Sequence, residues 1–123
     1  MKNLQVDDEF YKKLSKYAVF IPIINIDGKD HILFEVRSNL ISQAGEVSFP
    51  GGGVNEGEKF EMAAIRECRE ELNLDEKDIS LIGYSSMILS SSNRLIKAYY
   101  GRINKNFENI SYNMEVDSIF FVD

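Results

Sequence analysis

The sequence predicts a single α+β domain built around a mixed β-sheet, and three observations support this fold class. Its 123 residues are enough for one hydrophobic core. Apolar stretches rich in β-branched residues recur along the chain, which is typical of strands. One long segment, residues 58–72, contains neither glycine nor proline and is rich in Glu, Ala and Arg, which favours a helix.

The first part of the chain is predicted to form a short helix and then a hairpin. Residues 7–17 carry acids at their start and lysines towards their end, as the helix dipole favours. The apolar run 18–26 predicts a strand, in which Pro22 suggests a sheet edge or a bulge. The Asp-Gly pair at 27–28 is a strong hairpin signal, because glycine tolerates a positive φ. Residues 31–37 are therefore predicted to form the second strand.

Glycine is concentrated between residues 45 and 57, which hold five of the chain's eight glycines. This density is unfavourable in a helix or strand, so we expect a short strand at 47–49 that runs into a loop made mostly of backbone. After the helix, three strands are predicted at residues 79–89, 95–103 and 118–122. No helix is predicted after the last strand. Either the domain is shortened at its C-terminus or a partner, such as a second copy in a homodimer, covers that strand.

Charge and composition exclude several classes of function. Fourteen Lys and Arg against twenty Asp and Glu give a net charge of −6, which disfavours nucleic-acid binding. No apolar run approaches the roughly 18 residues of a membrane span, so no membrane association is expected. The single cysteine, Cys68, cannot form an internal disulfide and fits a reducing compartment, which predicts a cytoplasmic protein.

Three glutamates share one face of the predicted helix. At about 100° per residue, Glu67, Glu70 and Glu71 fall within an arc of roughly 100°. Their like charges repel one another unless the face is solvated or binds a cation. Hard divalent cations such as Mg²⁺ and Mn²⁺ prefer carboxylate oxygens. Two interpretations remain at this point, a solvated helix face and a metal site.

The loop before the helix favours the metal site. The spacing of its residues and those of the helix resembles the Nudix box, G-x5-E-x7-R-E-U-x-E-E-x-G-U, in which U is aliphatic. Cys68 stands at one aliphatic position and Asn73 at the last glycine. Both departures are mild, because a buried cysteine behaves as a small hydrophobe and asparagine tolerates the left-handed end of a helix. The six matching residues are Gly52, Glu58, Arg66, Glu67, Glu70 and Glu71.

This resemblance to the Nudix hydrolase family implies an enzyme that hydrolyses a nucleoside diphosphate linked to another moiety, using Mg²⁺ or Mn²⁺. The cations would neutralise the diphosphate and activate a water. The resemblance implies metal ligation by Glu67 and Glu71, with Glu70 as a further ligand or as a base that orients water. The carbonyl of Gly51 or Gly52 would complete the coordination.

Other residues enter the expected site through the same resemblance. Glu58 would pair with Arg66 and support the catalytic face, although Arg66 alternatively contacts a phosphate directly. In several Nudix enzymes a glutamate from a late loop reaches the metals as a ligand or base. Glu115 is the candidate for that role, with an ordinary surface acid as the alternative. The expected catalytic set is therefore Arg66, Glu67, Glu70 and Glu115.

Three segments resemble the coenzyme A diphosphatase branch of the family. Residues 33–38 and 45–52 resemble its motif L-L-x-x-R-S…R-x3-G-x-x-x-F-P-G-G, and residues 115–120 resemble its segment E-V-x-x-I/V-F. Arg37 would then contact the phosphates of the substrate, with a surface ion pair as the alternative, and Gly51 would line the substrate site. With the Nudix box, the resemblance covers almost the whole chain.

One departure bears on the substrate. Residues 38–44 lack the second arginine of that motif, and losing one charge-assisted contact weakens recognition of a 3′-phosphorylated nucleotide by about 1.5–3 kcal/mol. Coenzyme A is the first substrate candidate, and ADP-ribose or a nucleotide sugar is the second. The alternative of another class is a module that binds a nucleotide or a protein without hydrolysis.

Overall fold

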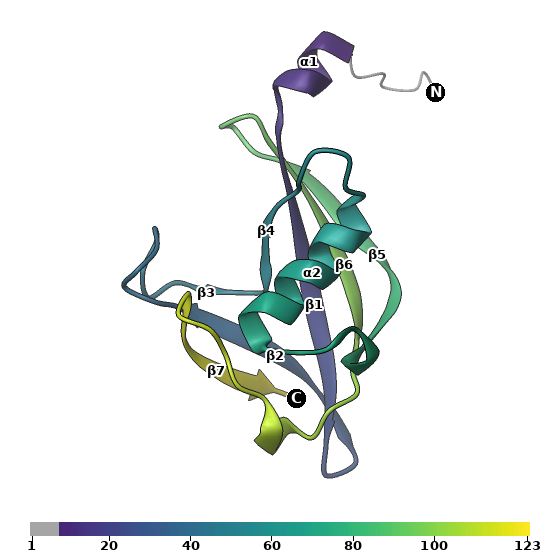
Figure 1. The fold of residues 1–123 in the computed structure, drawn as a ribbon, viewed down its shortest axis with the longest axis vertical. Helices are drawn as coiled ribbons and strands as arrows, with labels where there is room; N and C mark the ends of the chain where they lie inside the picture. The colour runs from purple at the N-terminus through teal and green to yellow at the C-terminus, as the bar shows by residue number, and fades with distance from the viewer. Residues whose placement is uncertain (1–7) are drawn as a thin grey trace.

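Residues 8–123 are described in the computed structural model, and they form a seven-stranded mixed sheet crossed by one long helix (Figure 1). The α+β class and the mixed sheet predicted from the sequence are confirmed. None of the helices within these residues has the length and apolar character needed to cross a membrane. In chain order the α-helices and strands are α1 (Asp8–Lys13), β1 (Ser15–Ile26), β2 (Lys29–Arg37), β3 (Val47–Ser48), β4 (Gly51–Gly53), α2 (Phe60–Leu72), β5 (Ile79–Leu89), β6 (Arg94–Ile103) and β7 (Val116–Val122). Two short 3-10 helices, η1 (Glu76–Asp78) and η2 (Phe107–Asn109), lie in the connections.

β1 lies in the middle of the sheet. It runs parallel to β6 on one edge, and its other edge pairs antiparallel first with β4 and then with β2. β5 pairs with β6, while β3 and β7 pair with β2. Pro22 therefore stands in a central strand and not at a sheet edge, contrary to the sequence prediction. It is tolerated because it lies between the β4 ladder, which ends at Val19, and the β2 ladder, which begins at Ile23.

The N-terminal helix is shorter than the sequence predicts. α1 ends at Lys13, whereas the prediction extended to Tyr17, and the predicted start, Asp7, lies outside the described residues. Ser15 and its two successors belong to β1, because their backbone finds partners in β6 and β4. Long-range strand pairing overrides the local helix preference here.

The predicted glycine loop contains a strand. Gly51–Gly53 form β4, paired with Tyr17 to Val19 of β1, so the expectation of a loop here was wrong. The pairing depends on the absence of side chains. A Cβ on Gly51 would come within 2.7 Å of the carbonyl oxygen of Ala18. Glycine therefore allows this backbone to lie directly against the central strand.

Two local signals of the sequence are confirmed. The Asp27-Gly28 turn joins β1 to β2, with φ values of 51° and 86° and the pair Ile26↔Lys29 closing the hairpin. Asn73 ends α2 in the left-handed conformation, with φ 51° and ψ 48°. Both turns depend on residues that accept a positive φ.

The core lies between α2 and the central strands of the sheet. Cys68 is fully buried in it, as expected for a cysteine that acts as a small hydrophobe. With one face of α2 fixed by this packing, the neighbouring face of the helix is turned towards β4 (Figure 1). The fully buried members of the core include Ala18, Phe20, Leu33, Ala63, Ala64 and Leu72.

The last strand, β7, is covered on one face. Phe121 meets Phe107 edge to face, with ring centroids 5.9 Å apart. On the other face, Phe120 and Val122 are 37% and 47% exposed. Self-association through this apolar face stays a prediction.

Candidate functional site

The glutamates of α2 lie against the glycine backbone of β4. The N–H of Gly51 donates a hydrogen bond to Oε2 of Glu71, with an N···O distance of 3.2 Å. A Cβ on Gly52 would lie 2.5 Å from Cδ of Glu67. Any larger residue at position 52 would therefore push the Glu67 carboxylate away, which explains in physical terms why the strand here carries no side chains.

Arg66 holds two of these carboxylates from the side of the helix. Its Nη1 donates to Glu67 at 2.9 Å and to Glu70 at 3.3 Å. Its Nε and Nη2 donate to the two carboxylate oxygens of Glu58, at 2.8 and 3.1 Å. Nη2 also donates to the carbonyl of Gly53 at 2.9 Å. One guanidinium thus joins α2, β4 and the loop between them.

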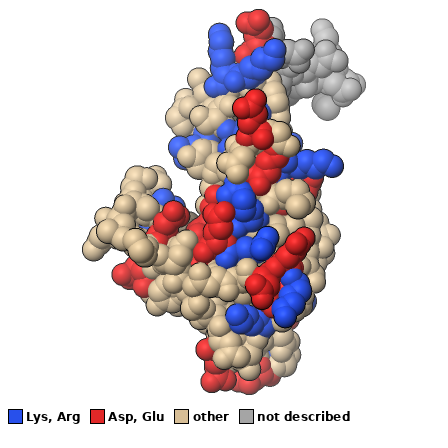
Figure 2. All heavy atoms as spheres, viewed as in Figure 1, with Lys and Arg blue, Asp and Glu red and all other residues tan. Residues whose placement is uncertain are grey.

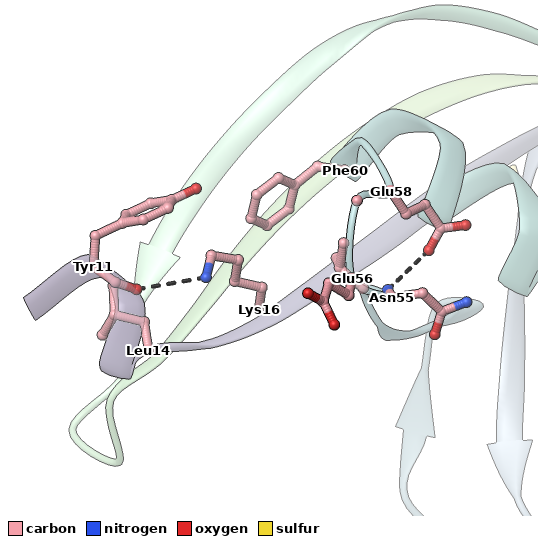
Figure 3. Close-up of a pocket in the computed structure, with 9 residues that line it drawn as sticks. Tyr11, Leu14, Lys16, Asn55, Glu56, Glu58 and Phe60 are labelled. Atoms are coloured by element: carbon pink, nitrogen blue, oxygen red, sulfur yellow. Dashed lines mark hydrogen bonds between the residues drawn. The ribbon is translucent and has the colours of Figure 1, made fainter. Parts of the chain in front are cut away.

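Glu58 connects that loop to Arg66. Its Oε1 also accepts a hydrogen bond from the backbone N–H of Asn55 at 3.0 Å (Figure 3). The hydrogen bonds from Arg66 lower the pKa of the Glu58 carboxyl below its ordinary value, so the ion pair is charged at neutral pH. The cavity drawn in Figure 3 lies on the α1 side of this loop and shares no lining residue with the cleft that the predicted site residues surround.

A carboxylate that the sequence analysis missed lies beneath the helix. Glu35 of β2 is 2% exposed and its carboxyl group neighbours that of Glu71, which is 5% exposed and also neighbours the carboxyl group of Glu67. Burial raises the pKa of Glu35 to about 7, and burial together with its carboxyl neighbours raises the pKa of Glu71 to about 11. A signal was present, because Glu35 shares the buried face of its strand with Leu33.

This donor set fits a hard divalent cation. The neighbouring carboxyl groups of Glu35, Glu67 and Glu71 cannot all be charged away from water unless a cation neutralises them. Oε2 of Glu35 is buried without a hydrogen-bond partner. Within residues 8–123, however, no three Asp, Glu, His or Cys side chains are arranged so that they could hold a metal ion as they stand. Arg66 holds oxygens of Glu67 and Glu70, so ligation by these two would require their carboxylates to turn.

Most of the predicted site residues meet around one cleft of about 430 Å³. Figure 2 shows a hollow with acidic side chains beside it, between the projecting loop that follows β2 and the body of the molecule. Glu71 lies beneath the cleft and not in its wall, and Arg66 and Glu58 lie beside it. The predicted residues that line the cleft are Arg37, Gly51, Gly52, Glu67, Glu70 and Glu115.

Backbone contacts bring Glu115 and Arg37 to this cleft from distant parts of the chain. The N–H of Asn113 donates to the carbonyl of Glu71 at 2.9 Å, and the N–H of Ser38 donates to the carbonyl of Glu115 at 3.0 Å. Nε of Arg37 donates to the carbonyl of Ser42 at 2.9 Å. The terminal nitrogens of Arg37 have no hydrogen-bond partner in the part of the chain that the structure describes.

Comparisons with known proteins show the family of this chain. A model of the NUDIX domain matches residues 14–111, which is most of the chain. The chain belongs to the NUDIX domain family. The match includes the helix with three glutamates, the glycine strand beside it and every strand of the sheet except β7.

Two curated relatives and one solved structure are similar to this NUDIX chain. Nudix hydrolase 3 of Caenorhabditis elegans is 33% identical over 113 residues, which cover 88% of this chain and 47% of that protein. Peroxisomal coenzyme A diphosphatase NUDT7 of Mus musculus is 30% identical over 116 residues, which cover 91% and 49%. The crystal structure of a C. elegans Ap4A hydrolase binary complex matches with a TM-score of 0.75 at 20% identity, covering 89% of this chain and 80% of that one, and shows a shared fold. The chain spans about half the length of the curated relatives it matches.

Proposed function

We propose that this NUDIX chain hydrolyses the diphosphate bond of a nucleoside diphosphate linked to another moiety, with Mg²⁺ or Mn²⁺ held by Glu67 and Glu71 and with Glu70 as a further ligand or as a base. The observation that carries the proposal is the meeting of two of these glutamates with glycine backbone and Arg37 around one cleft, above the buried Glu71. A bound divalent cation would neutralise diphosphate oxygens and lower the pKa of a bound water.

The substrate-facing residues would bind the diphosphate and let it approach closely. Arg37 has terminal nitrogens available for phosphate oxygens, and a guanidinium can bind such oxygens through two parallel hydrogen bonds. Gly51 and Gly52 line the same wall without side chains that would block the substrate. Their carbonyls are candidates to complete the coordination of a cation.

Proton transfer is assigned to the cleft's exposed acids. The Glu70 side chain is 54% exposed and open to water, so it is the first candidate to orient the attacking water. Glu115 lines the same cleft from the late loop and is the second candidate. Arg66 has its donors engaged by Glu58, by carboxylates of α2 and by a carbonyl, which supports a positioning role over direct phosphate contact.

We infer coenzyme A or a derivative as the first substrate. The three segments that resemble the coenzyme A diphosphatase branch lie far apart in the sequence, yet each contributes to the cleft, through Arg37, through Gly51 and Gly52, and through Glu115. The 30% identical mouse relative is named as a coenzyme A diphosphatase. A cytoplasmic location belongs to the same proposal, supported by the one cysteine, which is buried and unpaired.

A substrate panel tests this function. The chain is incubated with coenzyme A, ADP-ribose or a nucleotide sugar, each with Mg²⁺, Mn²⁺ or EDTA, and the products are identified by mass spectrometry. We expect metal-dependent cleavage within the diphosphate. Glu71→Gln keeps the shape of the side chain and removes its charge, so it should lower kcat by orders of magnitude. Glu76→Gln, at an exposed acid outside the cleft, is the matched control.

The panel also separates hydrolysis from binding alone. If nucleotides bind but none is cleaved above the EDTA control, the chain is a binding module and the proposed hydrolysis is wrong. If Glu71→Gln is folded and as active as the wild type, the assignment of metal ligands is wrong.

A further inference from the structure

A second cavity of about 540 Å³ continues from the cleft. Its walls carry two arginines, Arg37 and Arg94, and among the described residues that line it there is no aspartate or glutamate. Such a basic pocket is unexpected in a chain of net charge −6. It indicates a ligand with negative charge beyond the diphosphate. The residues common to both cavities are Tyr17, Arg37, Ser42, Gly51 and Gly52.

Arg94 stands in this cavity with unused hydrogen-bond donors. Its guanidinium carbon lies 4.0 Å from the ring centroid of Tyr17. Stacking of this kind fixes the plane of the guanidinium and leaves its N–H groups free at the edge. Nε of Arg94 and Oγ of Ser48, which lines the same cavity, are both buried without a hydrogen-bond partner.

Arg94, like Arg37, has no carboxylate partner among the described residues, whereas two other arginines have one. Arg66 pairs with Glu58, and Arg102, on the same strand as Arg94, pairs with Asp30. Within residues 8–123 no acidic side chain pairs with Arg94. A half-buried cation that stacks on a ring and has no anion beside it is suited to an anion supplied by a ligand.

Arg94 provides a cation where residues 38–44 lack one. That segment contributes Ser42 and Gln43 to the cavity, and neither is charged. Arg37 lines both cavities and so lies at the boundary with the cleft of Glu67 and Glu70. Arg94 lines only the cavity beyond. The two arginines are therefore placed for two anionic groups at different distances from the carboxylates.

We propose that Arg94 recognises a phosphate monoester on the ribose of the nucleotide, in place of the arginine missing from residues 38–44. The assignment rests on the proposed function, because it takes the diphosphate to lie beside Glu67 and Glu70. A nucleotide with a ribose phosphate uses both arginines, whereas ADP-ribose uses only Arg37. One charge-assisted contact of this kind amounts to a selectivity of roughly 10- to 100-fold.

A binding experiment tests Arg94 independently of catalysis. Affinities for adenosine 3′,5′-bisphosphate and for AMP are measured by calorimetry in EDTA. The wild type should bind the bisphosphate roughly 10- to 100-fold more tightly, and Arg94→Gln should bring the ratio close to one. Arg102→Gln removes the same charge from the same strand outside the cavity and should keep the wild-type ratio. A wild-type ratio close to one, or an unchanged ratio in Arg94→Gln, overturns the assignment.

Kinetics provides the second arm. The ratio of kcat/KM for coenzyme A to that for its 3′-dephospho form should fall in Arg94→Gln, through a higher KM for coenzyme A. If the wild type hydrolyses neither compound, the proposed function fails, and the binding ratio still decides the role of Arg94. Circular dichroism checks folding, and Arg94→Met, which removes the charge but keeps a long side chain, is made in parallel. Should neither variant fold, a wild-type binding ratio close to one still overturns the proposal.

Discussion

Replacing Arg66 by methionine should destabilise the metal-free protein by about 2–4 kcal/mol. The Arg66 side chain is 25% exposed, and its partners Glu58 and Glu67 are 17% and 15% exposed. The variant leaves both carboxylates without their ion-pair partner in a position that is mostly shielded from water. Removing one partner of a buried pair costs about 3–5 kcal/mol, and the remaining exposure reduces that figure. For a domain of this size, the expected fall in Tm is roughly 8–16 °C.

A double-mutant cycle isolates the ion pair from other effects of the substitution. Unfolding by urea at pH 7 in EDTA is followed by circular dichroism for the wild type, Arg66→Met, Glu58→Gln and the double variant. We expect a coupling free energy of about 1.5–3 kcal/mol. The matched control is the cycle on Arg102 and Asp30, which also form two hydrogen bonds but lie at the surface, so little coupling is expected.

The pH dependence of the coupling free energy is a further test of the ion pair between Arg66 and Glu58. Arg66 lowers the pKa of Glu58 in the folded protein, so the stabilisation is present above the ordinary value of 4.5 and is lost as pH falls through the lowered folded pKa. The coupling should therefore persist at pH 7 and vanish in strong acid. Additive free energies at pH 7, or an Arg66→Met variant as stable as the wild type, would refute the view that this pair supports the site.

Three further predictions follow from the packing beneath the cleft. Gly52→Ala should displace the Glu67 carboxylate and lower metal-dependent activity. Gly53→Ala, whose Cβ would meet nothing within 4 Å, should retain that activity, and equal activity of the two variants would contradict the close approach of Gly52 to Glu67. Burial raises the folded pKa of Glu35 to about 7, so the free energy of unfolding of the metal-free protein should fall as pH rises from about 4.5 through 7. In urea titrations Glu35→Gln should weaken this pH dependence, and an unchanged dependence would show that another group binds the protons. Burial also raises the pKa of the Cys68 thiol, so it should react with a disulfide reagent only after denaturation, and fast reaction of native protein would show that the core is open.

Much of the helix and its site could be predicted from the sequence because the information is local. The face shared by Glu67, Glu70 and Glu71 follows from helical periodicity alone. The turn at Asp27-Gly28 and the left-handed end of α2 at Asn73 follow from backbone preferences of one or two residues. The buried state of Cys68 follows from the apolar side of the same helix. None of these features depends on which strands pair.

Only the tertiary structure decided how distant segments meet. Gly51–Gly53 form a strand and not a loop because β1 offers them a free edge. Glu35 becomes a buried neighbour of Glu71 because β2 pairs with β1, against which α2 packs. Arg94 reaches the cavity of Arg37 because β6 runs parallel to β1. Hydrogen-bond partners and burial of this kind are set by strand order and register, which depend on residues far apart in the chain. By itself the sequence determined the class of chemistry, because a helix with three carboxylates follows a glycine-rich segment. Strand order decided which other charged residues lie near those carboxylates.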